Sequence, residues 1–143
     1  MGSASIYLGL MSGTSIDSID VAAVEFTRDT PSLLGTHSHP IPDSLKQQIL
    51  NLCLPGSDSV QLNCETDNRL GELFAEAALA LMSSLNIQAE QVAAIGSHGQ
   101  TVRHSPPGAD RLAFSQQIGD PTIIAARTGC PVVADFRRAD MAL

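Results

Sequence analysis

A glycine- and hydroxyl-rich turn between two apolar segments constrains the fold of this chain most. The run from Ile6 to Leu10 is apolar and leads into Met11-Ser12-Gly13-Thr14-Ser15, which suits a strand buried on both faces followed by a turn. A second strand, rich in valine and alanine, is predicted from about Ile19 to Phe26. Because the connection is short, we expect an antiparallel hairpin.

Three later segments carry helical signals. The longest is an amphipathic pattern that predicts a surface helix, with an apolar face formed by Leu70, Leu73, Phe74, Ala77, Leu81 and Leu85. A shorter helix is expected to begin at Pro42-Asp43-Ser44 and to end before Pro55-Gly56. A third is expected to begin at Pro121, with Asp120 as its cap, and to close at Gly129.

Short apolar segments predict further strands at about Ser32–His37, Val92–Gly96, Leu112–Ile118 and Pro131–Ala134, and a last helix is expected from Arg137. The order is therefore strands, helices, strand, helix, strand. A mixed sheet that starts with a hairpin and is flanked by helices fits an α/β layered domain of the ribonuclease-H-like kind. Because no linker is visible, we expect one domain over residues 1–143.

The composition excludes several classes of partner. Of the 143 residues 43% are hydrophobic, and the formal net charge is −7, which argues for a folded chain and against nucleic acid as the main partner. Lys46 is the single lysine, so there is no polybasic patch for anionic lipid. No apolar run approaches the roughly 18–20 residues of a membrane span. The first residues lack the basic region of a signal peptide, so we expect a cytoplasmic protein.

The cysteines and three of the histidines suggest no metal or disulfide framework. Cys53, Cys64 and Cys130 are odd in number and widely spaced, which fits neither a set of disulfides nor a zinc pattern. His37, His39 and His104 have no partners at metal-ligand spacing, so surface or loop roles suffice for them.

The hairpin turn is the most informative candidate for chemistry. Its glycine and hydroxyl side chains allow a phosphate to approach backbone N–H groups closely. Asp17 and Asp20 are placed to hold a hydrated Mg²⁺ or to orient the loop. The alternative is a plain hairpin turn in which Asp17 bonds to its own backbone. The turn is neither a Walker loop nor a dinucleotide-binding fingerprint.

Four stretches carry a resemblance to a known family. Met-Ser-Gly-Thr-Ser-Ile-Asp at residues 11–17 resembles the first phosphate loop of the actin-like ATPase superfamily and, more narrowly, the start of the anhydro-N-acetylmuramic acid kinases. Residues 95–102, residues 117–120, and residues 126–129 together with 133–137 are similar to later stretches of that family, in the same order and at compatible spacing. The resemblance covers essentially the whole chain. Ser18 departs from it, because the family usually has glycine there.

The resemblance implies an ATP- and Mg²⁺-dependent sugar kinase of peptidoglycan recycling. Such enzymes open the 1,6-anhydro bond of anhydro-N-acetylmuramic acid and phosphorylate O6, which gives N-acetylmuramic acid 6-phosphate. The chain would be the N-terminal, actin-like lobe of a two-lobed enzyme, with the second lobe, the adenosine site and the catalytic base beyond Leu143, and it would be inactive alone. The phosphates would bind Gly13, Thr14, Ser15, Ile16, Asp17, Ser18, Ile19 and Asp20, with Asp17 as a Mg²⁺ contact.

The same resemblance implies a sugar-binding set of His98, Gln100, Thr101, Arg127 and Asp135. Each charged or titratable member has a plainer alternative. His98 suits a loop-pinning hydrogen bond, and Arg127 suits a cation near a helix C-terminus. Asp135 suits a helix cap or an ion pair with one of the two following arginines. In its functional reading, the guanidinium of Arg127 would bind the lactyl carboxylate of a muramic acid.

Two other functions remain open at this stage. The chain is alternatively a one-lobe sugar- or phosphate-binding module, or half of a split assembly. A hydrolase that uses Asp17 and Asp20 is weaker, because both aspartates lie in one turn rather than across a cleft. A lone lobe is also expected to expose an apolar face and to self-associate or form a homodimer through it.

Overall fold

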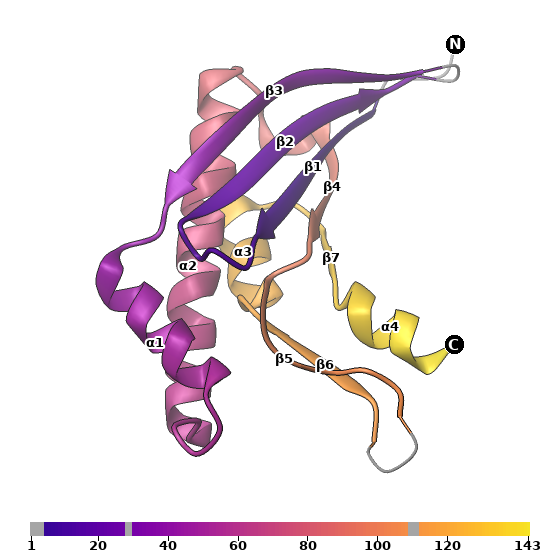
Figure 1. The fold of residues 1–143 in the computed structure, drawn as a ribbon. Coiled ribbons are helices and arrows are strands. Elements are labelled where there is room, and N and C mark those ends of the chain that lie inside the picture. Colours follow the sequence, from indigo (N-terminus) through magenta and orange to yellow (C-terminus); the bar gives the residue numbers. More distant parts are fainter. Residues whose placement is uncertain (1–4, 28–29, 109–111) are drawn as a thin grey trace.

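The computed structural model describes residues 5–27, 30–108 and 112–143. Its main element is a five-stranded mixed sheet in the order β3-β2-β1-β4-β7 (Figure 1), formed by β1 (Ser5–Ser12), β2 (Ser18–Phe26), β3 (Pro31–Pro40), β4 (Val92–Ser97) and β7 (Val132–Ala134). The β1–β2 and β2–β3 pairs are antiparallel, whereas β4 is parallel to both β1 and β7. The predicted hairpin is confirmed, and the mixed α/β architecture is that of an actin-like ATPase lobe.

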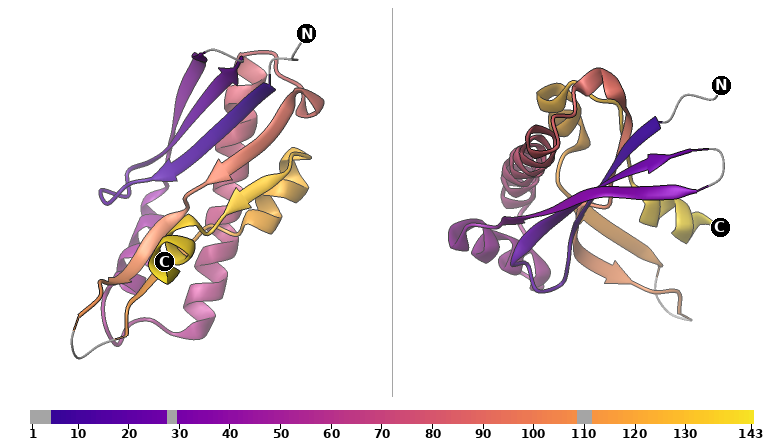
Figure 2. Two further views of the ribbon diagram at one scale, coloured as in Figure 1. Left: turned by 90° about the vertical axis from the view of Figure 1, so that its right-hand side faces the viewer. Right: turned by 90° about the horizontal axis from the view of Figure 1, so that it is seen from above.

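Four α-helices accompany the sheet in the described residues: α1 (Asp43–Cys53), α2 (Val60–Ser84), α3 (Pro121–Thr128) and α4 (Phe136–Ala142), with a 3₁₀ turn at Ala89–Gln91. Figure 2 shows the long helix α2 along one face of the sheet. Helix α2 begins ten residues before its predicted apolar face, because Ser59 caps it by accepting a hydrogen bond from the Leu62 N–H at 3.1 Å.

The core lies between this helix and the sheet. Alternate residues of β1, β2 and β4 point towards α2 and are buried, among them Leu8, Leu10, Ile19, Val21 and Ile95. The buried face of α2 contributes Leu70, Phe74, Ala77 and Leu81, as its spacing predicts. Asp120 caps α3 through its side chain, and Gly129 closes it at a φ of 71°, so both predicted helix signals are confirmed.

A separate two-stranded ribbon extends from the sheet. It pairs β5 (Gln100–Ser105) with β6 (Phe114–Ile118) in antiparallel register. Strand β5 was not predicted, because its residues are mostly polar. Arg103 ties the ribbon to the end of α1, because its guanidinium donates to the Leu52 carbonyl at 3.2 Å and to Asp58 at 2.8 Å.

The face of the sheet opposite α2 carries exposed apolar side chains and is largely uncovered within the described residues. Tyr7, Met11, Phe26 and Val133 lie on it and are between 39% and 54% exposed, and the rings of Tyr7 and Phe26 pack edge to face. Helix α4 covers only one part, where Phe136 approaches Gly96. The apolar face expected of a lone lobe is therefore present. No described helix has both the length and the hydrophobicity that a membrane crossing needs.

Candidate functional site

The loop between β1 and β2 presents small polar groups to solvent. Thr14 and Ser15 are exposed, and a Cβ added at Gly13 would meet no atom within 4 Å. Ile16 anchors the loop from below, because its side chain is 3% exposed and its N–H donates to the Gly13 carbonyl at 3.2 Å. Its φ of 55° is a strained value for a β-branched residue. The open backbone and hydroxyls fit a phosphate group.

Asp17 is held by the single lysine of the chain. Its carboxylate forms an ion pair with Lys46, whose hydrogen bond and charge lower the pKa of Asp17. The backbone carbonyl of Asp17 accepts a hydrogen bond from the Ile41 N–H at 3.0 Å. These contacts fasten the far side of the loop to the start of α1. The loop is therefore anchored to the domain at two points, by the buried Ile16 side chain and by the contacts of Asp17 with Ile41 and Lys46.

The last three residues of the predicted phosphate loop belong to β2. Ser18 has no positive φ, so serine in place of the family's usual glycine causes no backbone strain. The side chain of Ile19 is fully buried and leaves only its backbone for ligand contact. Asp20 lies on the uncovered face of the sheet, where it accepts a hydrogen bond from the Ser38 hydroxyl at 2.9 Å. Across the described residues, no three His, Cys, Asp or Glu side chains gather as a metal site.

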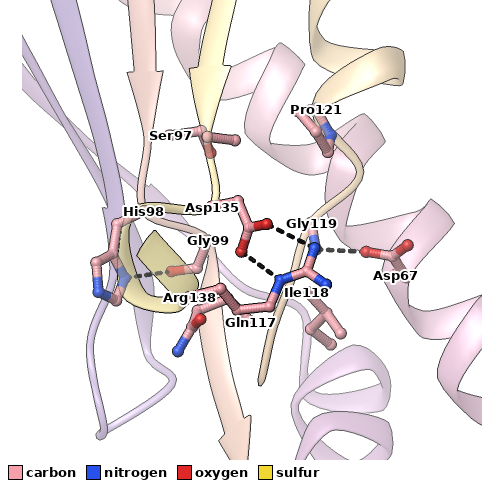
Figure 3. A pocket seen from close by; sticks show the side chains of 11 residues that line it. Asp67, Ser97, His98, Gly99, Gln117, Ile118, Gly119, Pro121, Asp135 and Arg138 are labelled. Atoms are coloured by element: carbon pink, nitrogen blue, oxygen red, sulfur yellow. Dashed lines mark hydrogen bonds and ion pairs between the residues drawn. The ribbon is translucent and has the colours of Figure 1, made fainter. Parts of the chain in front are cut away.

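A second polar region is a cavity of about 220 Å³ at the carboxyl ends of β4, β6 and β7 (Figure 3). Its walls come from six elements and their connections, and they are formed by Asp67, Ser97, His98, Gly99, Gln117, Ile118, Gly119, Pro121, Ala134, Asp135 and Arg138. Ligand sites in open α/β sheets commonly lie beyond the carboxyl ends of the strands. The position of the cavity therefore matches that of a binding site.

Two buried polar atoms of the cavity wall have no hydrogen-bond partner among the described residues: Ser97 Oγ and Gln117 Oε1. Ser97 is 1% exposed. The amide nitrogen of Gln117 is occupied, because it donates to Ser115 Oγ at 2.8 Å and to Thr101 Oγ1 at 3.0 Å. A buried polar group without a partner costs about 1–3 kcal/mol. Both atoms are therefore suited to a ligand that brings hydroxyl or amide groups.

Asp67 of α2 is a cavity residue that sequence reasoning missed. Its carboxylate accepts a hydrogen bond from the Gly119 N–H at 2.7 Å. Burial raises the pKa of Asp67 and the charge of Asp120 adds to the rise, while the hydrogen bond from Gly119 opposes it. A signal was available, since Asp67 stands three residues before Leu70 on the stripe that the helical spacing predicts to be buried.

Asp135 and Arg138 form a two-pronged ion pair on the opposite wall. Nε of Arg138 donates to Oδ1 at 2.7 Å, and Nη2 lies 2.5 Å from Oδ2. Asp135 precedes α4 but makes no side-chain capping bond, and its φ is 67°. Of the two plain alternatives for Asp135, the ion pair is thus present and the cap is not.

Comparison with known proteins identifies a family for the chain. The profile of the family described as anhydro-N-acetylmuramic acid kinase matches residues 5–143. The chain belongs to this family. Among curated relatives, the anhydro-N-acetylmuramic acid kinase of Shewanella pealeana is 50% identical over 96% of this chain and 37% of its own length. That of Saccharophagus degradans is 47% identical over 97% of the chain and 38% of its own length. The chain thus spans a little over a third of the relatives it matches.

The structure brings only part of the sugar-binding set implied by the kinase family to the cavity. His98 and Asp135 line it. His98 also makes the loop-pinning contact, with Nδ1 at 3.2 Å from the Gly99 carbonyl oxygen. Thr101 stands behind the wall, where it accepts the hydrogen bond from Gln117.

The other two members of the set lie elsewhere. Gln100 is 2% exposed; its carbonyl accepts from the Ser12 hydroxyl at 2.5 Å and its nitrogen donates to the Thr101 backbone. It therefore joins β1 to β5 rather than facing the cavity. Arg127 faces α2 and donates to Glu72 at 2.7 Å, an interaction that raises the pKa of the arginine.

Proposed function

We propose that residues 1–143 form the N-terminal lobe of a cytoplasmic, ATP-dependent kinase of peptidoglycan recycling. The reaction opens the 1,6-anhydro bond of anhydro-N-acetylmuramic acid with water and phosphorylates O6, which yields N-acetylmuramic acid 6-phosphate. Membership of the family and the named relatives support the reaction. The observation that carries the assignment of the sugar site is the cavity at the strand ends, in which Ser97 and Gln117 present buried polar atoms that have no partner among the described residues.

The phosphates of ATP would bind the loop from Gly13 to Asp20. Backbone N–H groups and the exposed hydroxyls of Thr14 and Ser15 supply the donors, since Lys46 is engaged by Asp17. A hydrated Mg²⁺ would neutralise charge on the transferred phosphoryl group. Asp17 is its proposed contact, for which the carboxylate would have to leave Lys46 or be shared with it. Mg²⁺ is commonly held by one or two carboxylates together with substrate phosphates and water, so a single aspartate suffices here.

The sugar would bind in the cavity. The hydroxyl of Ser97, the amide oxygen of Gln117 and the ring of His98 are proposed contacts for its polar groups, and Asp135 is held ready by Arg138. Gln100 and Thr101 would support the wall from behind. For Arg127 to bind the lactyl carboxylate, its guanidinium would have to leave Glu72.

The catalytic base and the adenosine site are proposed to lie in the part of the family's sequence that follows residue 143. The chain matches only 37% of the Shewanella pealeana relative, and the actin-like superfamily closes its nucleotide between two lobes. Purified residues 1–143 should therefore transfer no phosphate from ATP to the anhydro-sugar. Phosphorylation by this chain alone would contradict the proposal.

Binding measurements separate this proposal from a one-lobe binding module. Calorimetric titration of the chain with anhydro-N-acetylmuramic acid and with ATP gives two independent results. Sugar binding that is weakened by His98→Ala but not by the control His104→Ala supports the cavity as the sugar site, because His104 lies on the ribbon outside that cavity. Binding of sugar without any binding of nucleotide favours the module.

We also propose that the isolated chain self-associates through the uncovered face of the sheet. Exposed apolar patches of this kind mark interaction surfaces. Sedimentation at increasing concentration should show dimers or larger species, and Met11→Glu should reduce them. Leu112→Glu is the control, since Leu112 is 89% exposed but lies beside the ribbon. A monomer at all concentrations would contradict self-association.

A further inference from the structure

Two histidines of the edge strand β3 face each other outside both regions described above. His37 and His39 are two positions apart, so strand geometry places both on the face of the sheet towards α2. Nε2 of His37 lies 3.3 Å from Nδ1 of His39, and the rings are tilted by 60°. Both are half-buried, with Val21 and Ile19 of β2 beside them in the sheet. Neither belongs to the phosphate loop or to the cavity.

The separation of the two nitrogens matches the bite of a tetrahedral metal ion. Zinc binds imidazole nitrogen at about 2.0–2.1 Å, and two such bonds at the tetrahedral angle hold their nitrogens about 3.3 Å apart. The pair therefore needs little rearrangement to bind one cation through both rings. A strand also restricts the two side chains, which lowers the entropy that chelation would cost.

Glu76 of α2 favours the tautomer that chelation requires. Its carboxylate lies 3.8 Å from Nε2 of His39, which is beyond hydrogen-bond distance. The nearby negative charge favours the tautomer with its proton on Nε2, which leaves the lone pair on Nδ1, the atom that faces His37. Metal-bound histidines usually donate their second ring N–H to a carboxylate, a backbone carbonyl or water, and Glu76 would take that role by moving closer to His39. The neighbouring Glu72, one turn earlier on α2, is paired with Arg127 and leaves Glu76 as the acidic group beside the pair.

We propose that His37 and His39 form a two-histidine chelate for Zn²⁺, with Glu76 orienting His39. Because no group of three His, Cys, Asp or Glu side chains gathers in the described residues, water or an external donor would fill the other positions. Imidazole ligands suit Zn²⁺, Ni²⁺ and Cu²⁺, whereas Mg²⁺ prefers oxygen. The site is therefore distinct in chemistry from the Mg²⁺ contact proposed at Asp17.

Calorimetric titration of the chain with ZnCl₂ at neutral pH, after treatment with a chelator, tests the site. One equivalent should bind, and His37→Ala or His39→Ala should weaken the affinity at least tenfold. His104→Ala is the matched control and should change nothing, since that histidine lies on β5. Glu76→Gln should cause a smaller loss, and excess Mg²⁺ should not compete. Unchanged zinc affinity in both His37→Ala and His39→Ala would overturn the proposal.

A second measurement needs no variant. Nitrogen NMR of the unsubstituted chain should show the signals of His37 Nε2 and His39 Nδ1 shifting together on addition of one equivalent of Zn²⁺. Because metal binding requires neutral imidazole, the shifts should vanish in acid. Signals that stay at their metal-free positions at saturating zinc would show that the 3.3 Å contact is a hydrogen bond alone.

Discussion

Replacing Ser97 by alanine should stabilise the ligand-free chain. The hydroxyl is 1% exposed and has no hydrogen-bond partner in the described residues. Removing a buried polar group of this kind relieves about 1–3 kcal/mol. The lost oxygen enlarges the adjoining cavity by on the order of 10 Å³, which costs about 0.2 kcal/mol. The net gain in the free energy of unfolding is therefore about 1 kcal/mol or more, equivalent to a rise in Tm of roughly 3–4 °C.

Ser115→Ala is the matched control with the opposite expected sign. Ser115 is 2% exposed, and its hydroxyl accepts the hydrogen bond from Gln117 Nε2 at 2.8 Å. Deleting that hydroxyl leaves a donor without this partner and should cost about 1 kcal/mol. Urea denaturation followed by circular dichroism measures both variants, and equal m-values show that only stability has changed.

The same substitution should have the opposite effect on sugar binding. If the hydroxyl serves the sugar, Ser97→Ala should bind anhydro-N-acetylmuramic acid less tightly although it is the more stable protein. A Ser97→Ala variant that unfolds at lower urea than the unsubstituted chain would refute the reasoning, because it would show that the hydroxyl already has a partner in the free protein.

Three further predictions concern single residues. Lys46 lowers the pKa of Asp17 below its ordinary 3.8, so their ion pair stabilises the fold above pH 3.8, and this contribution is lost as the pH falls through the lowered pKa. The advantage of the unsubstituted chain over Lys46→Met in urea should therefore shrink as the pH is lowered from neutral through 3.8 and below, and a constant difference would contradict it. Burial raises the pKa of Asp67, so the ionised carboxylate destabilises the fold at neutral pH. The unsubstituted chain should therefore gain stability relative to Asp67→Asn as the pH falls through the raised pKa. Parallel profiles of unfolding free energy against pH for the two proteins would contradict this. Gly99→Ala would place a Cβ 2.6 Å from a backbone carbonyl oxygen at a φ of 71°, which should lower the free energy of unfolding by about 2–4 kcal/mol, measured by thermal unfolding. Gly13→Ala, where the Cβ would meet open space, should change the free energy of unfolding by no more than about 0.5 kcal/mol.

Features encoded by neighbouring residues could be predicted from the sequence. The hairpin follows from one apolar run, one short turn and a second apolar run. Helix α3 follows from Asp120 before Pro121 and Gly129 after Thr128. In each case the cause is a backbone preference or a cap that acts within a few residues, so the sequence alone contains it.

Features that depend on distant partners could not be predicted. Strand β5 is polar and is recognisable only by its pairing with β6. Asp67 reaches Gly119 across 52 positions, and Arg127 reaches Glu72 across 55, so neither partner is visible locally. The same holds within the proposed sugar site: nothing near Gln100 in sequence shows that Ser12 occupies its side chain. The sequence patterns located the loops around the cavity and two of its lining residues, His98 and Asp135, but not Asp67, Ser97 or Gln117.

The ion pair between Asp17 and Lys46 allows the state of the loop to be followed by chemical labelling of the lysine. Since Lys46 is the single lysine, an amine-directed acylating reagent has one side-chain target besides the α-amino group, and that target touches the loop proposed to bind phosphate. An ammonium group held by a carboxylate is less available for acylation than a free one. The rate of labelling at Lys46, read as the loss of tryptic cleavage after that residue, therefore follows how tightly the loop is held. A ligand that rearranges the loop changes that rate without any fluorophore, substitution or assay of turnover.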